Sequence, residues 1–310
     1  MDYIGIDIGG TKCAVVKGNL SDGVTQKCRF ETTTLDETLE KIFSAVEAMM
    51  PCEAIGISCG GPLDERRGVI LSPPNLPGFD EVHITDMLTE RFGVEAYLCN
   101  DANACALAEL RFGAGVGSSN MIFLTFGTGL GAGLIINGRL YSGTNGNAGE
   151  AGHVSLAKSG PLGYGKRGSF EGFCSGGGIT RLAQEAARSA RKKGRTLSYD
   201  KGDGALDALT TRALADMAKA GECDALCIFE KSAAKLGEGL AILIDLFNPD
   251  TIVIGSVYAR CEELFYPRMS KTLRKLALPK SLECCRIVPA MLGEEIGDIA
   301  ALCVAIEGKM

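Results

Sequence analysis

The residue types best suited to chemistry lie in two glycine turns, each of which follows an apolar run. The first turn is Asp7-Ile8-Gly9-Gly10-Thr11-Lys12 after Tyr3 to Ile6, and the second is Gly127-Thr128-Gly129-Leu130-Gly131 after Met121 to Phe126. Glycine lets backbone N–H groups approach an anion closely, and Thr hydroxyls and one lysine can share in binding it. Two such turns in one chain favour a phosphate group held between two lobes, and therefore a nucleotide site.

Other interpretations of these turns compete with a nucleotide site. Taken singly, each could be a tight hairpin that needs glycine only for its geometry. A dinucleotide fingerprint requires the glycines to open a helix, whereas Leu134 to Gly138 has the pattern of a strand and a hairpin turn. An NAD-dependent oxidoreductase is therefore disfavoured, and the pattern Gly-x-x-x-x-Gly-Lys-[Ser/Thr] of a Walker loop does not occur.

Carboxylates stand at two strand ends. Asp7 is placed to hold Mg²⁺ through water, although an Asp that stabilises its own turn explains it equally well. Asn100 and Asp101 stand between a strand and a helix, at the edge where α/β sheets commonly place their sites. Asp101 is thus a candidate catalytic residue, and the alternative is a helix N-cap.

A later glycine-rich region carries Glu150, His153 and Glu171. Carboxylates and an imidazole both donate or accept hydrogen bonds, so the group suits a polyhydroxylated ligand such as a sugar. Considered singly, the two glutamates are explained as solvated surface charges and the histidine as a hydrogen-bonded structural residue.

Composition bounds the function classes. The chain has 310 residues, 46% hydrophobic and 23% charged, with a net charge of −6, which argues against a nucleic-acid surface. Without an apolar run of about 18 residues or a signal peptide, we expect a cytoplasmic protein with no membrane contact. Thirteen cysteines without Cys-x-x-Cys spacing, such as those at positions 59, 99, 105, 227 and 303, are expected to be buried reduced thiols.

The pattern along the chain predicts an α/β fold of two related lobes, with the ligand in the cleft between them. A strand meander (Tyr3 to Ile8, Cys13 to Lys17, Gln26 to Thr33) opens the chain, and a second begins at Met121 with a hairpin at Asn137-Gly138. The 60–79 stretch is expected to be a long functional loop. Helices are expected at 39–49, 84–92, 102–112, 179–193, 206–220, 224–247 and 295–307, further strands at 54–58, 94–99, 251–254 and 285–290, and a solvated helix end at the basic run 191–195.

Several motifs taken together resemble the ROK family of sugar kinases, repressors and related open reading frames. They are DIGGTK at 7–12, Asn100-Asp101 before a helix, the 125–133 loop, Glu150-Ala151-Gly152-His153, and TIVIGS at 251–256. The resemblance covers nearly the whole chain, and the Glu-x-Gly-His element makes it specific. It implies an actin-like ATPase (ribonuclease H-like) fold with an interlobe cleft, a small lobe of 1–115 plus 295–310, and a large lobe of 116–294.

The resemblance also implies roles for individual residues. Asp101 matches the catalytic base, and Asp7 the carboxylate that holds Mg²⁺ through water. Sugar contacts are matched by Gly61, Asn75, Asn100, Asp101, Glu150, His153 and Glu171. ATP contacts are matched by Asp7, Gly9, Gly10, Thr11, Lys12, Thr125, Gly127, Thr128, Gly129, Gly177, Gly255 and Ser256.

One departure from the family is plain. After His153 the family usually has three cysteines that bind zinc, but Leu162, Tyr164 and Ser169 stand in their places here. We therefore expect no zinc, and a loop held by packing. We expect ATP-dependent phosphorylation of a hexose or amino-hexose at the 6-hydroxyl by a homodimer that binds no nucleic acid. The alternative is a sugar-binding sensor without catalysis.

Overall fold

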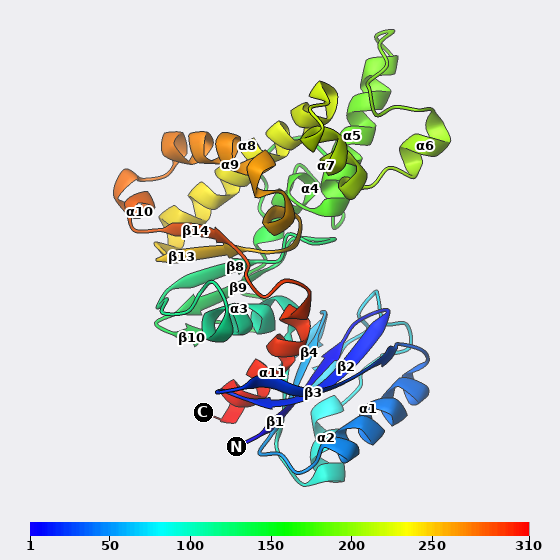
Figure 1. The fold of residues 1–310 in the computed structure, drawn as a ribbon, viewed down its shortest axis with the longest axis vertical. Helices are drawn as coiled ribbons and strands as arrows, with labels where there is room; N and C mark the ends of the chain where they lie inside the picture. The colour runs from blue at the N-terminus through cyan, green and yellow to red at the C-terminus, as the bar shows by residue number, and fades with distance from the viewer. Residues whose placement is uncertain (310) are drawn as a thin grey trace. The chain divides into compact units, whose positions relative to one another are not determined.

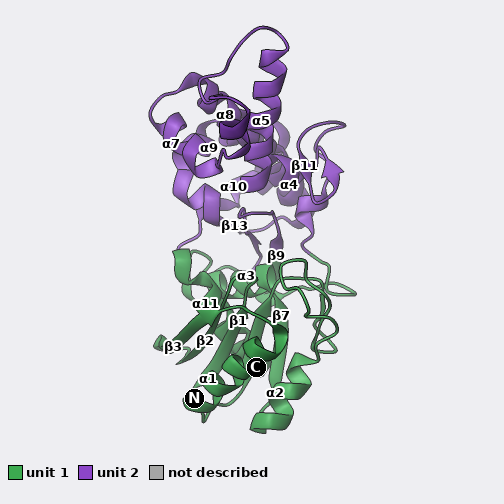
Figure 2. Ribbon diagram, turned by 90° about the vertical axis from the view of Figure 1, so that its right-hand side faces the viewer, with its two compact units in different colours: residues 1–118, 133–148, 292–310 green, residues 119–132, 149–291 purple. Residues whose placement is uncertain are grey.

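A computed structural model describes residues 1–309, which divide into two compact units (Figure 2). The first unit comprises residues 1–118, 133–148 and the chain from 292 onward, and the second comprises 119–132 and 149–291. Two of these breaks lie close to the predicted lobe boundaries at 115 and 295. The segment 133–148, which was predicted for the large lobe, groups instead with the first unit.

The first unit is built on a five-stranded sheet of order β3-β2-β1-β4-β7. The opening meander predicted from the sequence is confirmed, because β1 pairs antiparallel with β2 and β2 with β3, while β4 and β7 extend the sheet in parallel. The strand bounds are β1 Tyr3–Ile8, β2 Lys12–Asn19, β3 Gly23–Glu31, β4 Ile55–Cys59 and β7 Ala96–Asn100. The carboxyl ends of β1 and β7 therefore present Asp7 and Asn100 at one edge of the sheet.

Helices cover both faces of this sheet (Figure 1). The side chains of Ile4, Ile6 and Ile8 pack with α1 (Leu35–Met49) and α2 (Ile84–Phe92), whose apolar residues recur at helical spacing. On the opposite face Val16 packs with Leu302 of α11 (Ile296–Lys309). Thr34 begins α1 by accepting the Glu37 N–H, and Gly93 ends α2 in the left-handed conformation.

Helix α11 approaches the sheet backbone closely because small residues face it. A Cβ atom added to Gly5 would lie 2.4 Å from the Leu302 nitrogen, and one added to Gly56 would lie 2.2 Å from the Ala305 nitrogen. Neither position has room for any side chain. Glycine at these strand positions thus sets the distance between helix and sheet.

A short ladder, a hairpin, one more helix and a turn complete the first unit. The 60–79 stretch, predicted as a loop, contains a short ladder of β5 (Leu63–Asp64) and β6 (Val69–Ile70). The predicted hairpin is confirmed between β9 (Ala132–Ile136) and β10 (Arg139–Leu140), where Asn137 and Gly138 have φ of 53° and 74°. Helix α3 and the turn η2 are also present, with bounds Asp101–Phe112 and Gly293–Glu295.

The second unit has three parallel strands surrounded mainly by helices. Strand β13 (Thr251–Ile254) pairs with β8 (Met121–Leu124) and with β14 (Arg286–Pro289). The helices are α4 Phe170–Phe173, α5 Gly176–Arg191, α6 Asp203–Asp207, α7 Thr211–Lys219, α8 Cys223–Phe247, α9 Ser256–Leu276 and α10 Pro279–Glu283. The unit also contains the turn η1 (Ala151–His153) and a hairpin formed by β11 (Leu162–Gly163) and β12 (Lys166–Arg167).

Two expectations for the second unit need correction. The single helix predicted at 206–220 is two helices, because Thr210 caps α7 by accepting the Ala213 N–H and so starts a new helix. Cys227 is exposed rather than buried. The solvated helix end predicted at 191–195 is confirmed, because α5 ends at Arg191 and residues 192–195 are exposed; Arg191 also pairs with Asp200 and Arg195 with Asp224.

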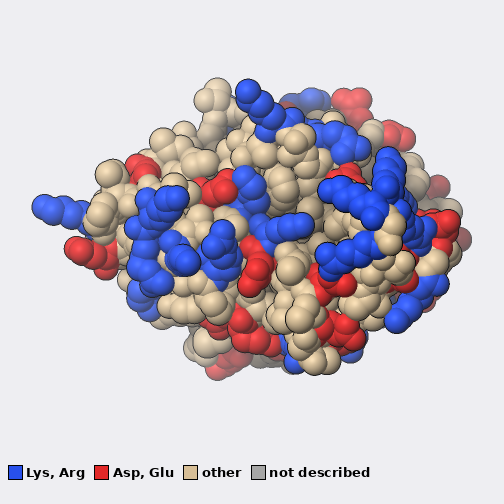
Figure 3. Space-filling model, turned by 90° about the horizontal axis from the view of Figure 1, so that it is seen from above, with Lys and Arg blue, Asp and Glu red and all other residues tan. Residues whose placement is uncertain are grey.

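Charges of both signs are interspersed on the face drawn in Figure 3. In the second unit Arg188 and Asp207 form an ion pair, with their charged atoms 2.8 Å apart. Within residues 1–309, no helix is long and apolar enough to span a membrane.

Candidate active site

The corner between β7 and α3 carries the predicted catalytic residue. Asn100, and not Asp101, is the N-cap of α3: its Oδ1 accepts the Ala102 N–H at 2.9 Å. Asp101 is the first helical residue, is exposed, and accepts the same N–H through Oδ1 at 2.8 Å. A carboxylate in the first turn is favoured by the helix dipole. Because Asn100 takes over the cap, Asp101 is not required for that purpose.

Glu65, which belongs to none of the recognisable motifs, holds this corner in place. Its Oε1 accepts the backbone N–H of Asn100 at 3.0 Å and the amide of Asn103 at 3.3 Å. Glu65 lies in the turn between β5 and β6, 35 residues before Asn100. Nothing in the local pattern distinguishes it from a surface glutamate, so only the folded chain identifies it.

Asp7 is partly buried at the end of β1, with other carboxylates around it. Burial, followed by the negative charges of Asp298 and Asp101, raises the pKa of Asp7 to about 6, while Arg29 and Lys27 oppose this rise. Asp298, in the first turn of α11, is only 3% exposed and pairs with Lys27 and, at 3.5 Å, with Arg29. When the pKa of a carboxyl group is raised in this way, a bound cation would stabilise its ionised form.

The raised pKa predicts a stability effect of Asp7→Asn. Because the folded state holds the Asp7 proton more tightly than the unfolded state, the carboxylate destabilises the fold once pH rises from about 4 through about 6. Asp7→Asn should therefore raise the free energy of unfolding at pH 8 by on the order of 1–3 kcal/mol, and by much less at pH 4. Urea unfolding at both pH values, without divalent cation, measures it; an equal change at the two values would contradict this account.

The first glycine turn lies against the predicted sugar-binding loop within the first unit. A Cβ atom on Gly10 would lie 2.5 Å from the carbonyl oxygen of Asn75, so the two backbones touch. The turn is closed by the Gly9 N–H, which donates to the Lys12 carbonyl at 3.1 Å. Thr11 and Lys12 are exposed beyond it, as is the side chain of Asn75.

Two further glycines border the corner between β7 and α3. A Cβ atom on Gly60 would lie 3.8 Å from Asp101 Oδ2, and one on Gly61 would lie 3.7 Å from the amide nitrogen of Asn100. The first unit therefore gathers Asp7, the 9–12 turn, Gly61, Asn75, Asn100 and Asp101.

The second glycine turn in the other unit is closed by Thr125. Its N–H donates to the Gly131 carbonyl at 3.0 Å, and its hydroxyl accepts the Gly131 N–H at 2.9 Å. Phe126, which is fully buried, has a φ of 35°. A bulky residue in this conformation is strained, and such strain often accompanies a functional loop.

The starts of α5 and α9 meet this turn. The Gly176 N–H donates to the Gly127 carbonyl at 2.7 Å, and a Cβ atom on Gly177 would lie 3.4 Å from the Thr128 carbonyl. A Cβ atom added to Gly127 would lie 3.7 Å from the Ser256 hydroxyl oxygen. The predicted nucleotide residues of this unit, Thr125, Gly127, Thr128, Gly129, Gly177, Gly255 and Ser256, thus surround one turn. Thr211 was not predicted, but its hydroxyl donates to the Gly176 carbonyl at 2.5 Å.

Glu171 links this turn to the region that carries His153. Its Oε2 accepts the Leu130 N–H at 3.1 Å, and its Cβ lies 3.3 Å from the position a Cβ would take on Gly152. The turn η1 exposes Glu150 and His153 on either side of the buried Ala151-Gly152 pair. Within the second unit, the predicted sugar-binding residues Glu150, His153 and Glu171 therefore lie in one region.

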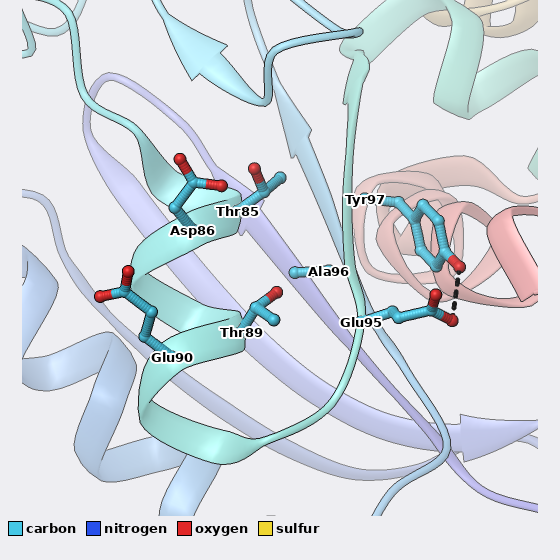
Figure 4. A pocket seen from close by; sticks show the side chains of 7 residues that line it. All are labelled: Thr85, Asp86, Thr89, Glu90, Glu95, Ala96 and Tyr97. Carbon is cyan, nitrogen blue, oxygen red and sulfur yellow. Dashed lines mark hydrogen bonds between the residues drawn. The ribbon is translucent and has the colours of Figure 1, made fainter.

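A shallow pocket lies elsewhere, between α2 and β7 of the first unit (Figure 4). Its lining includes Thr85, Glu90 and Glu95, and the Tyr97 hydroxyl donates to Glu95 at 3.1 Å. None of the predicted site residues lines this pocket.

Comparisons with known proteins agree with the motif resemblance. The profile of the ROK family matches residues 3–307. The chain belongs to the ROK family. This ROK chain is 31% identical to the glucokinase of Thermotoga maritima over 318 residues, covering 99% of this chain and 98% of that one.

Solved structures of ROK proteins share the fold over the full length. The ROK hexokinase from Thermus thermophilus has a TM-score of 0.83 and 31% identity, covering 100% of this chain and 99% of that one. A ROK glucokinase from Streptomyces griseus, solved with glucose and AMPPNP, has a TM-score of 0.78 and 31% identity, covering 99% of this chain and 100% of that one. The predicted fold class, α/β of the actin-like ATPase type, is thereby confirmed.

The grouping of metal-ligating side chains limits the kinds of metal site that this ROK chain can form. Among residues 1–309, no three or more His, Cys, Asp or Glu side chains are grouped closely enough to hold a metal ion directly. A cation held through its own waters needs only one or two carboxylates, and Asp7 offers one.

Proposed function

We propose that the chain is an ATP-dependent kinase that transfers the γ-phosphoryl group of ATP to the 6-hydroxyl of a hexose or amino-hexose. The observation that carries this proposal is the corner between β7 and α3 of the first unit. There the charge of Asp101 contributes to the raised pKa of Asp7, and Asp101 Oδ2 lies 3.8 Å from the position a Cβ would take on Gly60, in a chain that belongs to the ROK family. The glucokinase activity of similar proteins supports it further.

In this mechanism Asp101 accepts the proton of the attacking sugar hydroxyl. Asn100 caps α3 and Glu65 fixes the backbone of the corner, so the start of the helix does not depend on the Asp101 carboxylate. A well-placed general base contributes roughly 10² to 10⁴ in rate. The remaining predicted sugar residues hold the ring through hydrogen bonds: Gly61, Asn75, Asn100, Glu150, His153 and Glu171.

The two glycine turns hold the phosphates of ATP. Phosphoryl transfer depends mainly on alignment and on neutralising charge, and exposed backbone N–H groups with Thr11, Lys12 and Thr128 supply both. Mg²⁺ fits Asp7 because an oxygen ligand with a raised pKa gains most from a nearby cation. When bound, the ion neutralises phosphate charge. Gly177, Gly255 and Ser256 contact the nucleoside.

We further propose that the protein binds the sugar and ATP as a cytoplasmic homodimer. Exclusion of water from the bound sugar would limit hydrolysis of ATP. The second candidate function is a non-catalytic sugar sensor, which would need neither Asp7 nor Asp101. Both aspartates are present, and this favours the enzyme.

A coupled ADP-release assay with a panel of hexoses tests the proposal. Glucose, mannose, N-acetylglucosamine and N-acetylmannosamine cover both kinds of 2-substituent, and 6-deoxyglucose tests the acceptor hydroxyl. We expect sugar-dependent ADP release with at least one hexose, and none with 6-deoxyglucose. Turnover of 6-deoxyglucose would refute the 6-hydroxyl assignment, and hexose binding without any ADP release would favour the sensor.

We predict that the purified protein contains no stoichiometric zinc. Leu162, Tyr164 and Ser169 cannot supply the thiolates that a tetrahedral site requires. Elemental analysis by mass spectrometry, after expression with added zinc, measures the content. One zinc per chain would overturn this prediction.

A further inference from the structure

Positively charged side chains hold the segment 153–173 of the second unit by donating to its backbone carbonyls. Lys166 Nζ donates to the His153 carbonyl at 2.7 Å, and Lys235 Nζ from α8 donates to the Leu156 carbonyl at 3.1 Å. Arg167 donates to the Gly160 carbonyl at 3.1 Å. The segment that carries the imidazole of His153 is therefore ordered by contacts within the chain.

Tyr164 occupies an unusual place in this segment. With Gly165 it forms the two-residue turn between β11 and β12, and the two residues have φ of 40° and 77°. Such turns favour Asn, Asp or Gly at both positions, because other side chains are strained there. Tyr164 is nevertheless 71% exposed, so burial in a core does not explain the choice of residue.

The Tyr164 ring contacts the imidazole of His153. The two ring centroids are 5.2 Å apart and the planes meet at 82°, an edge-to-face arrangement that aromatic rings prefer. Lys166, two residues further on, holds the carbonyl of the same histidine. One short hairpin thus fixes both the side chain and the main chain of His153.

We propose that the β11–β12 hairpin positions His153 for sugar binding, with Tyr164 as the positioning residue for the imidazole and Lys166 as the positioning residue for the backbone. The inference rests on the proposed function, in which His153 contacts the sugar. Strain at Tyr164 distinguishes this role from a structural one, because Asn at the same place would suit the turn better.

Tyr164→Asn tests the proposal, since it relieves the turn while removing the ring. NMR of the imidazole CH groups is simple to interpret because the chain has two histidines, and His83, in the first unit, is an internal control. We expect the His153 signals to lose the ring-current shift from Tyr164, the His83 signals to stay, and the melting temperature not to fall. Hexose binding by calorimetry should weaken about 3- to 10-fold, with KM for ATP unchanged.

Lys166→Met tests the second arm, with Lys158→Met as its matched control. Lys158 is an exposed lysine of the same segment with no hydrogen-bond or ion-pair partner among the described residues. Amide hydrogen exchange at residues 150–156 should be faster in Lys166→Met than in Lys158→Met, and hexose affinity should fall only in the former. Equal exchange and affinity in the two variants would overturn the role of Lys166.

Two outcomes with Tyr164→Asn would overturn its role: unchanged His153 signals, or changed signals with unchanged hexose affinity. Failure of the proposed function looks different. Wild-type protein would then neither bind nor phosphorylate any hexose, which would also remove the sugar role of His153. The His153 signals are compared without sugar. The contact between Tyr164 and His153 can therefore be tested even if the protein binds no hexose.

Discussion

Asp101→Asn should lower kcat by about 10²- to 10⁴-fold while changing sugar affinity little. Asparagine keeps the size of the side chain and an oxygen able to accept the Ala102 N–H, but it cannot take a proton from the attacking hydroxyl. The loss should therefore appear in kcat, with the KM for hexose nearly unchanged. Steady-state ADP release over a range of hexose concentrations gives both constants.

Asp86→Asn is the matched control for this experiment. Asp86 also lies in the first turn of a helix, α2, and is 65% exposed, so its substitution removes a comparable charge and dipole interaction from the same unit. Its turnover should match wild type. An Asp101→Asn enzyme that retains more than about a tenth of wild-type kcat would exclude a general-base role.

Gly56→Ala should destabilise the first unit by about 3 kcal/mol or more. The added methyl group would lie 2.2 Å from the Ala305 nitrogen and 2.5 Å from the Ala301 carbonyl oxygen, both of them α11 backbone atoms that cannot rotate away. Helix α11 would have to move off β4 as a body. Urea unfolding followed by circular dichroism measures the loss.

Gly204→Ala provides the control with the opposite expected sign. Gly204 lies in α6, and a Cβ atom there meets nothing within 4 Å. Because alanine restricts the unfolded chain and favours helix, the variant should gain about 0.4–1 kcal/mol. A Gly56→Ala protein as stable as wild type would show that α11 does not pack as described.

The sequence predicted those features whose signal is local. The alternating and helical apolar patterns located β1, α2 and β13 almost to the residue, and Asn137-Gly138 identified a hairpin. Both glycine turns and the Asn100-Asp101 corner were recognisable because short spacing alone defines them. Their chemical roles remain predictions that the proposed assays test.

Features that depend on distant partners could not be predicted. Glu65 accepts a hydrogen bond from the Asn100 backbone, 35 residues away in the sequence. The negative charge of Asp298 raises the pKa of Asp7, although nearly the whole chain separates the two residues in sequence. The choice between Asn100 and Asp101 as cap depended on backbone angles, because either side chain can accept the Ala102 N–H. The sequence did not show that Gly5 and Gly56 face a helix, because a glycine within a strand has several possible explanations.

The first unit is assembled from three separated stretches of chain, and this has a consequence for biosynthesis. Its β1 and β4 strands leave the ribosome early, but α11, which covers them, is translated only after residues 149–291 of the second unit. At roughly 5–20 residues per second, the uncovered sheet face waits for tens of seconds. During that interval the nascent chain exposes apolar surface to chaperones.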